Sequence, residues 1–157
     1  MPEEFNNDKM NFDAALARGS VLNSVTMLEK IIDVYISMYY SQKGKQNQFF
    51  RIFMSRTEFK RKIDIFKETV IIHQPNFKKD YPSYLDDLRK IIDSRNIFAH
   101  EVLDISQDGM INYNKGSLQF DNFKKDRKKN TFNDLEINSL RELIHKYSEI
   151  IKDLLSK

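Results

Sequence analysis

The chain has 157 residues, of which 31% are charged, with no cysteine, four glycines, three prolines and a formal net charge of +3. This length fits one domain with a core of its own, and the lack of cysteine excludes a disulfide scaffold, a thiolate metal site and a cysteine nucleophile. Few chain breakers and many charges favour long helices, and the small positive excess permits a nucleic-acid partner without requiring one.

The sequence predicts a soluble cytoplasmic protein with all 157 residues in one domain and no membrane partner. Residues 1–5 are polar and acidic, unlike a secretory signal peptide, and no apolar run approaches the roughly 18 residues that span a bilayer. Residues 1–12 are polar and Asn-rich, so we expect them to be flexible or to form a short helical lead-in.

Hydrophobic periodicity predicts four long helices. The first runs from Asp13 to Tyr40 and is followed by a loop at residues 41–48. The second spans Thr57 to His73, with Thr57 as its N-cap, and the third runs from about Pro82 to Ala99. The last runs from Asn133 to Leu155. The apolar residues expected to face the core are Leu22, Val25, Leu28, Ile32, Tyr35 and Tyr39; Phe59, Ile63, Phe66 and Val70; Leu85, Leu88 and Ile92; and Ile137, Leu140, Ile144, Tyr147, Ile151 and Leu154.

The spacing of hydrophobic residues changes between the third and the last of these helices. Residues 110–113 and 117–120 flank Asn114-Lys115-Gly116, a turn with glycine where a positive φ is wanted, and this pattern predicts a β-hairpin. Residues 122–130 then read as a basic polar loop. The predicted fold is therefore mainly all-α, an antiparallel four-helix up-and-down bundle with a small hairpin and a basic loop within residues 104–132.

The end of the third helix carries polar residues where its apolar stripe should continue. On a helical wheel with Ile92 at zero and about 100° per residue, Arg95 lies at about −60°, Asn96 at about +40° and His100 at about +80°. The three side chains thus share an arc of roughly 140° centred close to Ile92. Polar groups buried at such positions destabilise a protein unless they are paired, so their placement needs a reason.

One reason is phosphodiester chemistry. An arginine such as Arg95 can hold a phosphate with two parallel hydrogen bonds and offset charge that develops in the transition state. An imidazole such as that of His100 can take a proton from a ribose 2′-OH at neutral pH, and Asn96 can orient the imidazole or the phosphate. The sequence shows no cluster of metal ligands, so we expect a mechanism without metal or cofactor. RNA is then the expected substrate, because DNA lacks the internal nucleophile.

The alternative is structural. Arg95 and Asn96 can form a buried polar network that joins two helices or two subunits, with His100 capping the C-terminus of the helix. Residue chemistry alone favours this alternative, because an Arg and a His five positions apart occur by chance in many proteins.

The segment Ser94-Arg95-Asn96-Ile97-Phe98-Ala99-His100 resembles the signature of the HEPN superfamily: Arg, a polar residue that is often Asn, a short spacer and then His, at a helix end. Three further segments are similar to the mannitol-operon-repressor-like branch of that superfamily. They are Gly19-Ser20, Leu28-Glu29 and Phe59-Lys60-Arg61-Lys62-Ile63. The resemblance covers about residues 15–105, and the Arg-Asn…His motif is its specific part.

The resemblance implies an antiparallel helical bundle that dimerises with the motif helices facing one another. Many members of the superfamily are ribonucleases, often toxins, whereas others show no cleavage. Carried over to this chain, the functional positions are Arg95, Asn96 and His100. Three hypotheses follow: a homodimeric endoribonuclease, a non-catalytic homodimeric module that binds RNA, a nucleotide or a protein, and a pure dimerisation domain. An antitoxin or a regulatory protein is a further expected partner.

A basic run in the predicted loop is a weaker candidate for RNA binding. It is either a solvated loop or a set of phosphate contacts, with Phe120, Phe123 and Phe132 as nearby stacking faces. The basic residues concerned are Lys124, Lys125, Arg127, Lys128 and Lys129.

Overall fold

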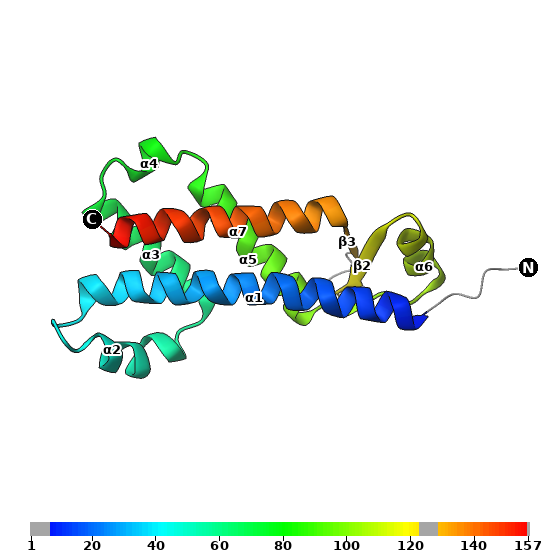
Figure 1. Ribbon diagram of the computed structural model, residues 1–157, viewed down its shortest axis with the longest axis horizontal. Coiled ribbons are helices and arrows are strands. Elements are labelled where there is room, and N and C mark those ends of the chain that lie inside the picture. The colour runs from blue at the N-terminus through cyan, green and yellow to red at the C-terminus, as the bar shows by residue number, and fades with distance from the viewer. Residues whose placement is uncertain (1–6, 123–128, 157) are drawn as a thin grey trace, which may run out of the picture. The chain divides into compact units, whose positions relative to one another are not determined.

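The computed structural model describes residues 7–122 and 129–156. These residues are mainly helical and include a three-stranded antiparallel sheet (Figure 1). None of the helices in the described ranges has the length and apolarity needed to cross a bilayer. The chain divides into two compact units: unit 1 comprises residues 1–24 and 93–142, and unit 2 comprises residues 25–92 and 143–157.

All secondary-structure elements in the described residues of unit 2 are helices. Its elements are the C-terminal part of α1 (Asn7–Tyr40), α2 (Gln46–Ile52), the short 3-10 helix η1 (Met54–Arg56), α3 (Phe59–His73), α4 (Phe77–Asp80), the first part of α5 (Tyr84–His100) and the end of α7 (Asp134–Leu155).

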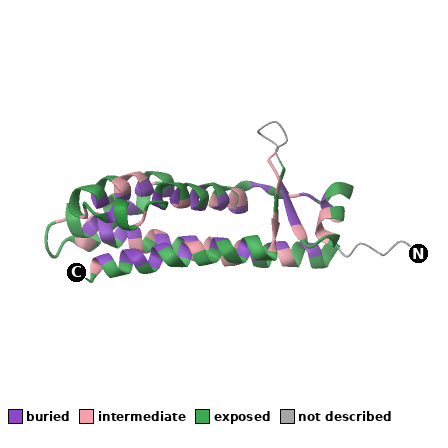
Figure 2. Cartoon of the chain, turned by 90° about the horizontal axis from the view of Figure 1, so that it is seen from above, coloured by how far each residue is buried: buried purple, intermediate pink, exposed green. Residues whose placement is uncertain are grey.

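The core of unit 2 follows the predicted apolar stripes. All four stripe residues of α3 are buried, and the six predicted for α7 are buried along that helix. Figure 2 shows how buried and exposed positions alternate along the long helices. Contacts between aromatic rings link the helices. The centre of the Phe66 ring lies 5.3 Å from that of Tyr35 and 6.1 Å from that of Phe77, and both pairs are edge-on. The ring centres of Phe77 and Tyr84 are 5.2 Å apart. Such edge-to-face pairs stabilise a core beyond the area that they bury.

A buried ion-pair cluster joins α1 to α3 in unit 2. The Lys62 Nζ donates hydrogen bonds to Glu29 Oε1 at 2.7 Å and to Asp33 Oδ2 at 2.8 Å. Lys62 and Asp33 are 3% and 2% exposed, so both charges are withdrawn from water. Burial raises the pKa of the Asp33 carboxyl, and the contact with Lys62 opposes that rise.

Four details of the prediction for unit 2 are wrong. Tyr39 was expected in the core of α1 but is 36% exposed. Leu85 was expected in the core of α5 but is 39% exposed, and Tyr84 and Ile91 are buried instead. The expected loop at residues 41–48 ends early, because α2 begins at Gln46. Thr57 does not cap α3: the helix begins at Phe59, and the Thr57 hydroxyl donates to the Phe53 carbonyl.

Unit 1 combines helix ends with the sheet. It contains the start of α1, the end of α5, β1 (Val102–Leu103), α6 (Gln107–Asn114), β2 (Ser117–Asp121), β3 (Lys129–Asn133) and the start of α7. The strands are antiparallel in the order β1-β2-β3, and the register pairs Leu103 with Phe120 and Leu118 with Phe132. The central strand β2 therefore carries buried side chains at Leu118 and Phe120.

The predicted hairpin at residues 110–120 is wrong in its first strand. Met110–Tyr113 lies in α6, and β2 pairs instead with β3, a strand that the sequence did not predict and whose first two residues were placed in the basic loop. The helix begins at a good N-cap, because Ser106 Oγ accepts a hydrogen bond from the Gly109 amide. The turn glycine is confirmed, since Gly116 has φ 83°, but it ends a helix rather than joining two strands.

The start of α7 is a capping box. Asn133 Oδ1 accepts from the Glu136 amide, and Glu136 Oε2 accepts from the Asn133 amide, each at 2.9 Å. These two reciprocal bonds make Asn133 the N-cap of α7. The predicted start of the helix, Asn133, is therefore one residue before the first helical residue, Asp134.

Candidate functional site

The three motif residues lie together at the C-terminal end of α5. Arg95 Nη1 donates to Asn96 Oδ1 at 3.2 Å and lies 3.2 Å from His100 Nε2. One guanidinium nitrogen therefore contacts both of the other side chains. Within the described residues Arg95 forms no ion pair with a carboxylate, so the guanidinium keeps its remaining donors for another acceptor.

The cluster is on the surface of the chain rather than in its core. Asn96 and His100 are exposed and Arg95 is half-buried, whereas Phe98 of the same turn is fully buried. The expectation that all three continue the buried stripe is therefore wrong. The stripe of α5 passes through Leu88 and Ile91 to Phe98 instead. The polar side chains need no buried partner, because water can reach them.

The contact between the two side chains is a hydrogen bond in one imidazole tautomer only. Arginine has donors only, so the contact at His100 Nε2 is a hydrogen bond only when that nitrogen carries no proton. In this arrangement Nδ1 carries the proton and Nε2 is the basic nitrogen. A proton acceptor and a phosphate-binding fork thus stand side by side.

Arg18 of α1 anchors the end of α5. Its guanidinium donates to the Phe98 carbonyl at 3.3 Å and to the Glu101 carbonyl, and it lies 4.9 Å from the centre of the Phe120 ring. These carbonyls lie at the helix end, where acceptors lack partners within the helix. Burial lowers the pKa of Arg18. Arg18 thus serves as the C-terminal cap, the role that the structural alternative gave to His100.

The Glu101 side chain ties the same helix end to the sheet. Its carboxylate accepts hydrogen bonds from Asn122 Nδ2 at 3.2 Å and from Asn130 Nδ2 at 2.8 Å, and Glu101 is 8% exposed. Sequence reasoning missed both Arg18 and Glu101. The position of Glu101 directly after the motif His could have indicated a role for Glu101 at the helix end. No residue near Arg18 in the sequence indicates that Arg18 binds a partner about 80 positions away.

We expect Arg18→Ala to lower the free energy of unfolding by about 1–3 kcal/mol, because two helix-end carbonyls lose a charged donor. Arg18→Lys should recover only part of this loss, since one ammonium cannot reproduce the planar fork and its ring contact. Urea unfolding followed by circular dichroism measures the change, with Lys30→Ala, an exposed position on the same helix, as the matched control. Equal stability of the Arg18→Ala and Lys30→Ala proteins would contradict the anchoring role.

A second polar network surrounds Asp104, which is 7% exposed. Burial alone would raise its pKa, but hydrogen bonds from Ser106, Lys129 and Gln119 outweigh burial and hold the pKa of Asp104 well below its ordinary value. Because the pKa is lowered in the folded state, the stabilisation is present above the ordinary pKa of 3.8 and is lost as the pH falls below it.

Of the five basic residues in this run, only Lys129 lies within the described residues. Lys124, Lys125, Arg127 and Lys128 lie outside the described residues. Lys129 belongs to β3, where its Nζ lies 3.0 Å from Asp104 Oδ2 and 3.5 Å from Asp108 Oδ2. Two carboxylates therefore already compensate the charge of Lys129, the residue for which the sequence suggested a contact with RNA phosphate.

The aromatic residues near that run do not all offer stacking faces. Phe120 is fully buried, and its ring packs 5.3 Å from Phe98 and 6.2 Å from Phe132. Phe132 is half-buried in the same cluster, and Phe123 lies outside the described residues. Phe120 therefore belongs to the core of unit 1, and its proposed role as an exposed stacking face is wrong.

No group of three or more His, Asp or Glu side chains in residues 7–122 and 129–156 is arranged to hold a metal ion. Comparison with known proteins found no matching family model, no similar curated protein and no similar solved structure.

Proposed function

We propose that this protein is a metal-independent endoribonuclease that cleaves RNA through its 2′-OH. The observation that carries the proposal is the contact of Arg95 Nη1 with both Asn96 Oδ1 and His100 Nε2 at a solvent-accessible helix end. A structural arginine would instead have its guanidinium bound to other groups of the chain, as Arg18 binds the carbonyls of Phe98 and Glu101. The resemblance of residues 94–100 to the HEPN signature supports the same assignment.

Each side chain has one role in the proposed reaction. A phosphate of the RNA attracts the Arg95 guanidinium, which turns from His100 and leaves Nε2 free. His100 Nε2 then takes the proton of the 2′-OH while that oxygen attacks the phosphorus. The imidazolium returns the proton to the 5′-oxygen as the bond between that oxygen and the phosphorus breaks. Arg95 offsets the charge on the phosphate oxygens, and Asn96 positions the guanidinium or the phosphate. The products are a 2′,3′-cyclic phosphate and a 5′-hydroxyl.

The proposal extends to assembly and setting. The active form would be a cytoplasmic homodimer of antiparallel four-helix up-and-down bundles, with two α5 ends at a common cleft and an antitoxin or a regulatory protein as a further partner. The facing α5 ends and the antitoxin rest on the resemblance, whereas the bundle rests on hydrophobic periodicity and the cytoplasmic setting on composition. The alternative is a non-catalytic homodimeric regulatory module, in which the same exposed cluster binds RNA, a nucleotide or a protein.

Incubation of the purified protein with RNA in EDTA separates these functions. The ribonuclease should generate 2′,3′-cyclic phosphate ends, and an oligonucleotide with a single 2′-deoxy substitution at the cleavage site should stay intact there, because the nucleophile is missing. Mass spectrometry of the products identifies the ends. RNA that remains whole although the protein binds it would contradict the enzyme and favour the binding module.

A further inference from the structure

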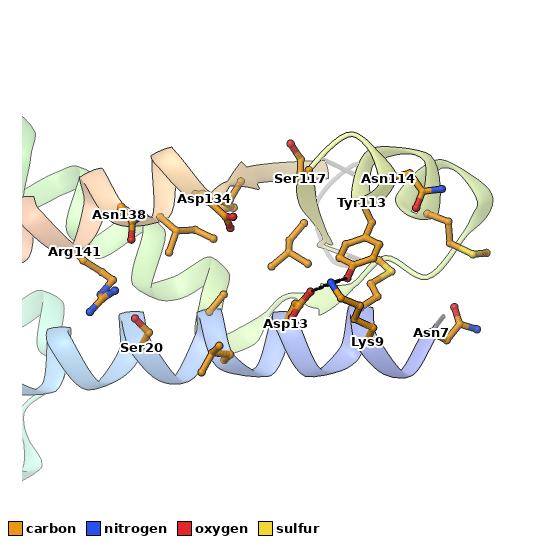
Figure 3. Close-up of a pocket in the computed structure, with 18 residues that line it drawn as sticks. Asn7, Lys9, Asp13, Ser20, Tyr113, Asn114, Ser117, Asp134, Asn138 and Arg141 are labelled. Atoms are coloured by element: carbon orange, nitrogen blue, oxygen red, sulfur yellow. Dashed lines mark hydrogen bonds and ion pairs between the residues drawn. The ribbon is translucent and has the colours of Figure 1, made fainter. Parts of the chain in front are cut away.

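Unit 1 contains a cavity of about 910 Å³ that the motif residues do not line. Its walls come from the start of α1, from α6, from β2 and β3, and from the first turns of α7 (Figure 3). This volume lies within the range of pockets that hold small molecules, roughly 300–1,000 Å³. Arg95, Asn96 and His100 are absent from the lining, so the inference drawn from the cavity does not rest on the ribonuclease proposal.

Part of the cavity lining is apolar. Met10, Leu118 and Ile137, from three different elements, contribute to its lining and are 2%, 7% and 8% exposed. Leu16 also lines it and is 64% exposed, so an apolar side chain stands at the cavity with most of its surface in water. Covering such surface with an apolar ligand is favourable.

The polar groups on the α6 side bind one another. The Tyr113 hydroxyl donates to Asp13 Oδ2 at 2.7 Å, and Lys9 Nζ donates to the same oxygen and to the Tyr113 hydroxyl, each at 3.1 Å. These bonds lower the pKa of the Asp13 carboxyl. The negative charge of Asp13 is therefore compensated by its neighbours and leaves this end of the cavity without a strong preference for a cation.

The opposite end offers donors. Arg141 extends from α7 towards α1, on the side where Ser20 lies (Figure 3). No ion pair to Arg141 occurs in the part of the chain that the structure describes, and the buried Ser20 Oγ has no hydrogen-bond partner there. Asn138, one turn before Arg141, adds an amide. A guanidinium, a hydroxyl and an amide thus line one end of a partly apolar cavity.

The other charged residue that α7 contributes to the cavity lining is Asp134. It lies seven residues before Arg141, which is about 10 Å along the helix axis at 1.5 Å per residue. Asp134 is in the first turn of α7, where the helix dipole stabilises a carboxylate without a ligand. Arg141 lies in the third turn and has no such compensation. Charge complementarity therefore favours an anion at Arg141 over a cation at Asp134.

We infer that this cavity binds a small amphipathic carboxylate, with its apolar body against Met10, Leu118 and Ile137 and its carboxylate on Arg141. The guanidinium holds the carboxylate with two parallel hydrogen bonds.

The test titrates the full chain with three ten-carbon probes: decanoate, decan-1-ol and decylamine. Decanoate should bind saturably, about tenfold or more tightly than decan-1-ol, since a charged hydrogen-bonded pair is added to the same apolar contacts. Decylamine should bind no more tightly than the alcohol. Amide chemical shifts should change at the cavity-lining residues. Absence of saturable binding below about 1 mM, equal affinity for acid and alcohol, or shifts confined to other surfaces would each overturn the inference.

Two exposed positions on α7 supply matched variants. Arg141→Gln should remove the preference for decanoate over decan-1-ol, whereas Asp134→Asn should leave decanoate affinity unchanged or slightly raised. Both residues are on the surface, so neither change disturbs the core. A decanoate affinity that is unchanged in Arg141→Gln would overturn the assignment of the carboxylate to this residue.

Discussion

The His100→Ala protein should cleave RNA in EDTA at least about 100-fold more slowly than the wild type, because positioned general bases contribute typically 10²–10⁴-fold. His100 is exposed, and within the described residues its side chain has a hydrogen-bond contact with Arg95 alone, so its loss should leave stability and RNA affinity nearly unchanged. Arg95→Lys keeps the charge but not the planar fork and should also slow cleavage substantially. Initial rates on one labelled RNA measure both effects, with Lys90→Ala, exposed on the same helix, as the control.

Mixing two inactive proteins tests where one site obtains its side chains. Arg95 and His100 of a single chain already lie 3.2 Å apart, so a mixture of Arg95→Ala and His100→Ala proteins should stay inactive. If one site instead took its Arg and His from different subunits, half of the dimers would be mixed with one intact site each, and about a quarter of the activity would return. Such a recovery would show that the contact within one chain is not the reacting pair.

The second large effect concerns stability. Lys62→Ala should lower the free energy of unfolding by about 3–5 kcal/mol, because it leaves the buried Asp33 and the adjacent Glu29 without their counter-ion. Chemical denaturation at neutral pH measures the loss. Without the ammonium, the pKa of Asp33 should rise further, so the penalty is full at neutral pH and shrinks as acidification protonates the carboxyl.

Two variants serve as controls for Lys62. Lys67 pairs with Asp64 at 3.7 Å on the outer side of α3, and Lys67→Ala should change stability by less than about 1 kcal/mol. Adding Asp33→Asn to Lys62→Ala should restore part of the loss, because one unpaired buried charge is then removed. A Lys62→Ala protein as stable as the Lys67→Ala protein would show that the cluster is not a main support of unit 2.

The helices were predictable because their stripes are strong. In α3 and α7 every predicted core residue is buried, since the residues recur at helical steps over about three or more turns. The stripe of α5 misled at Leu85, because Tyr84 and Ile91 give an equally regular face and sequence alone does not choose between them. The amphipathic pattern thus indicates that a helix exists better than it indicates which of two overlapping faces is buried.

The segment between α5 and α7 was harder to predict because it depends on contacts with other parts of the chain. Residues 110–113 are mostly apolar or aromatic and precede a turn sequence, as a strand would, but Ser106 caps a helix there and the Asp104 backbone packs against Gly109. A Cβ at Gly109 would lie 1.9 Å from the Asp104 carbonyl oxygen, so only glycine fits this approach. Neither the cap nor the close approach follows from periodicity.

For the candidate site, the sequence predicted the proximity of the three motif residues, since positions four or five apart on a helix are neighbours. Their exposure was not predicted, because the burial of a helix face depends on which elements pack against it. The anchoring of the helix end by Arg18 was also beyond the sequence, as it joins residues about 80 positions apart.

The two hydrogen bonds to the Glu101 carboxylate have a consequence for protein engineering. Asn122 and Asn130, on either side of the connection from β2 to β3, are held by the same buried acid. The ends of that connection are therefore set by a residue outside it. Doubling the length of the connection should then cost only about 0.6 kcal/mol in loop entropy. A peptide epitope or a fluorophore site grafted between residues 122 and 129 would report on the protein while the end of α5 keeps its ties to the sheet.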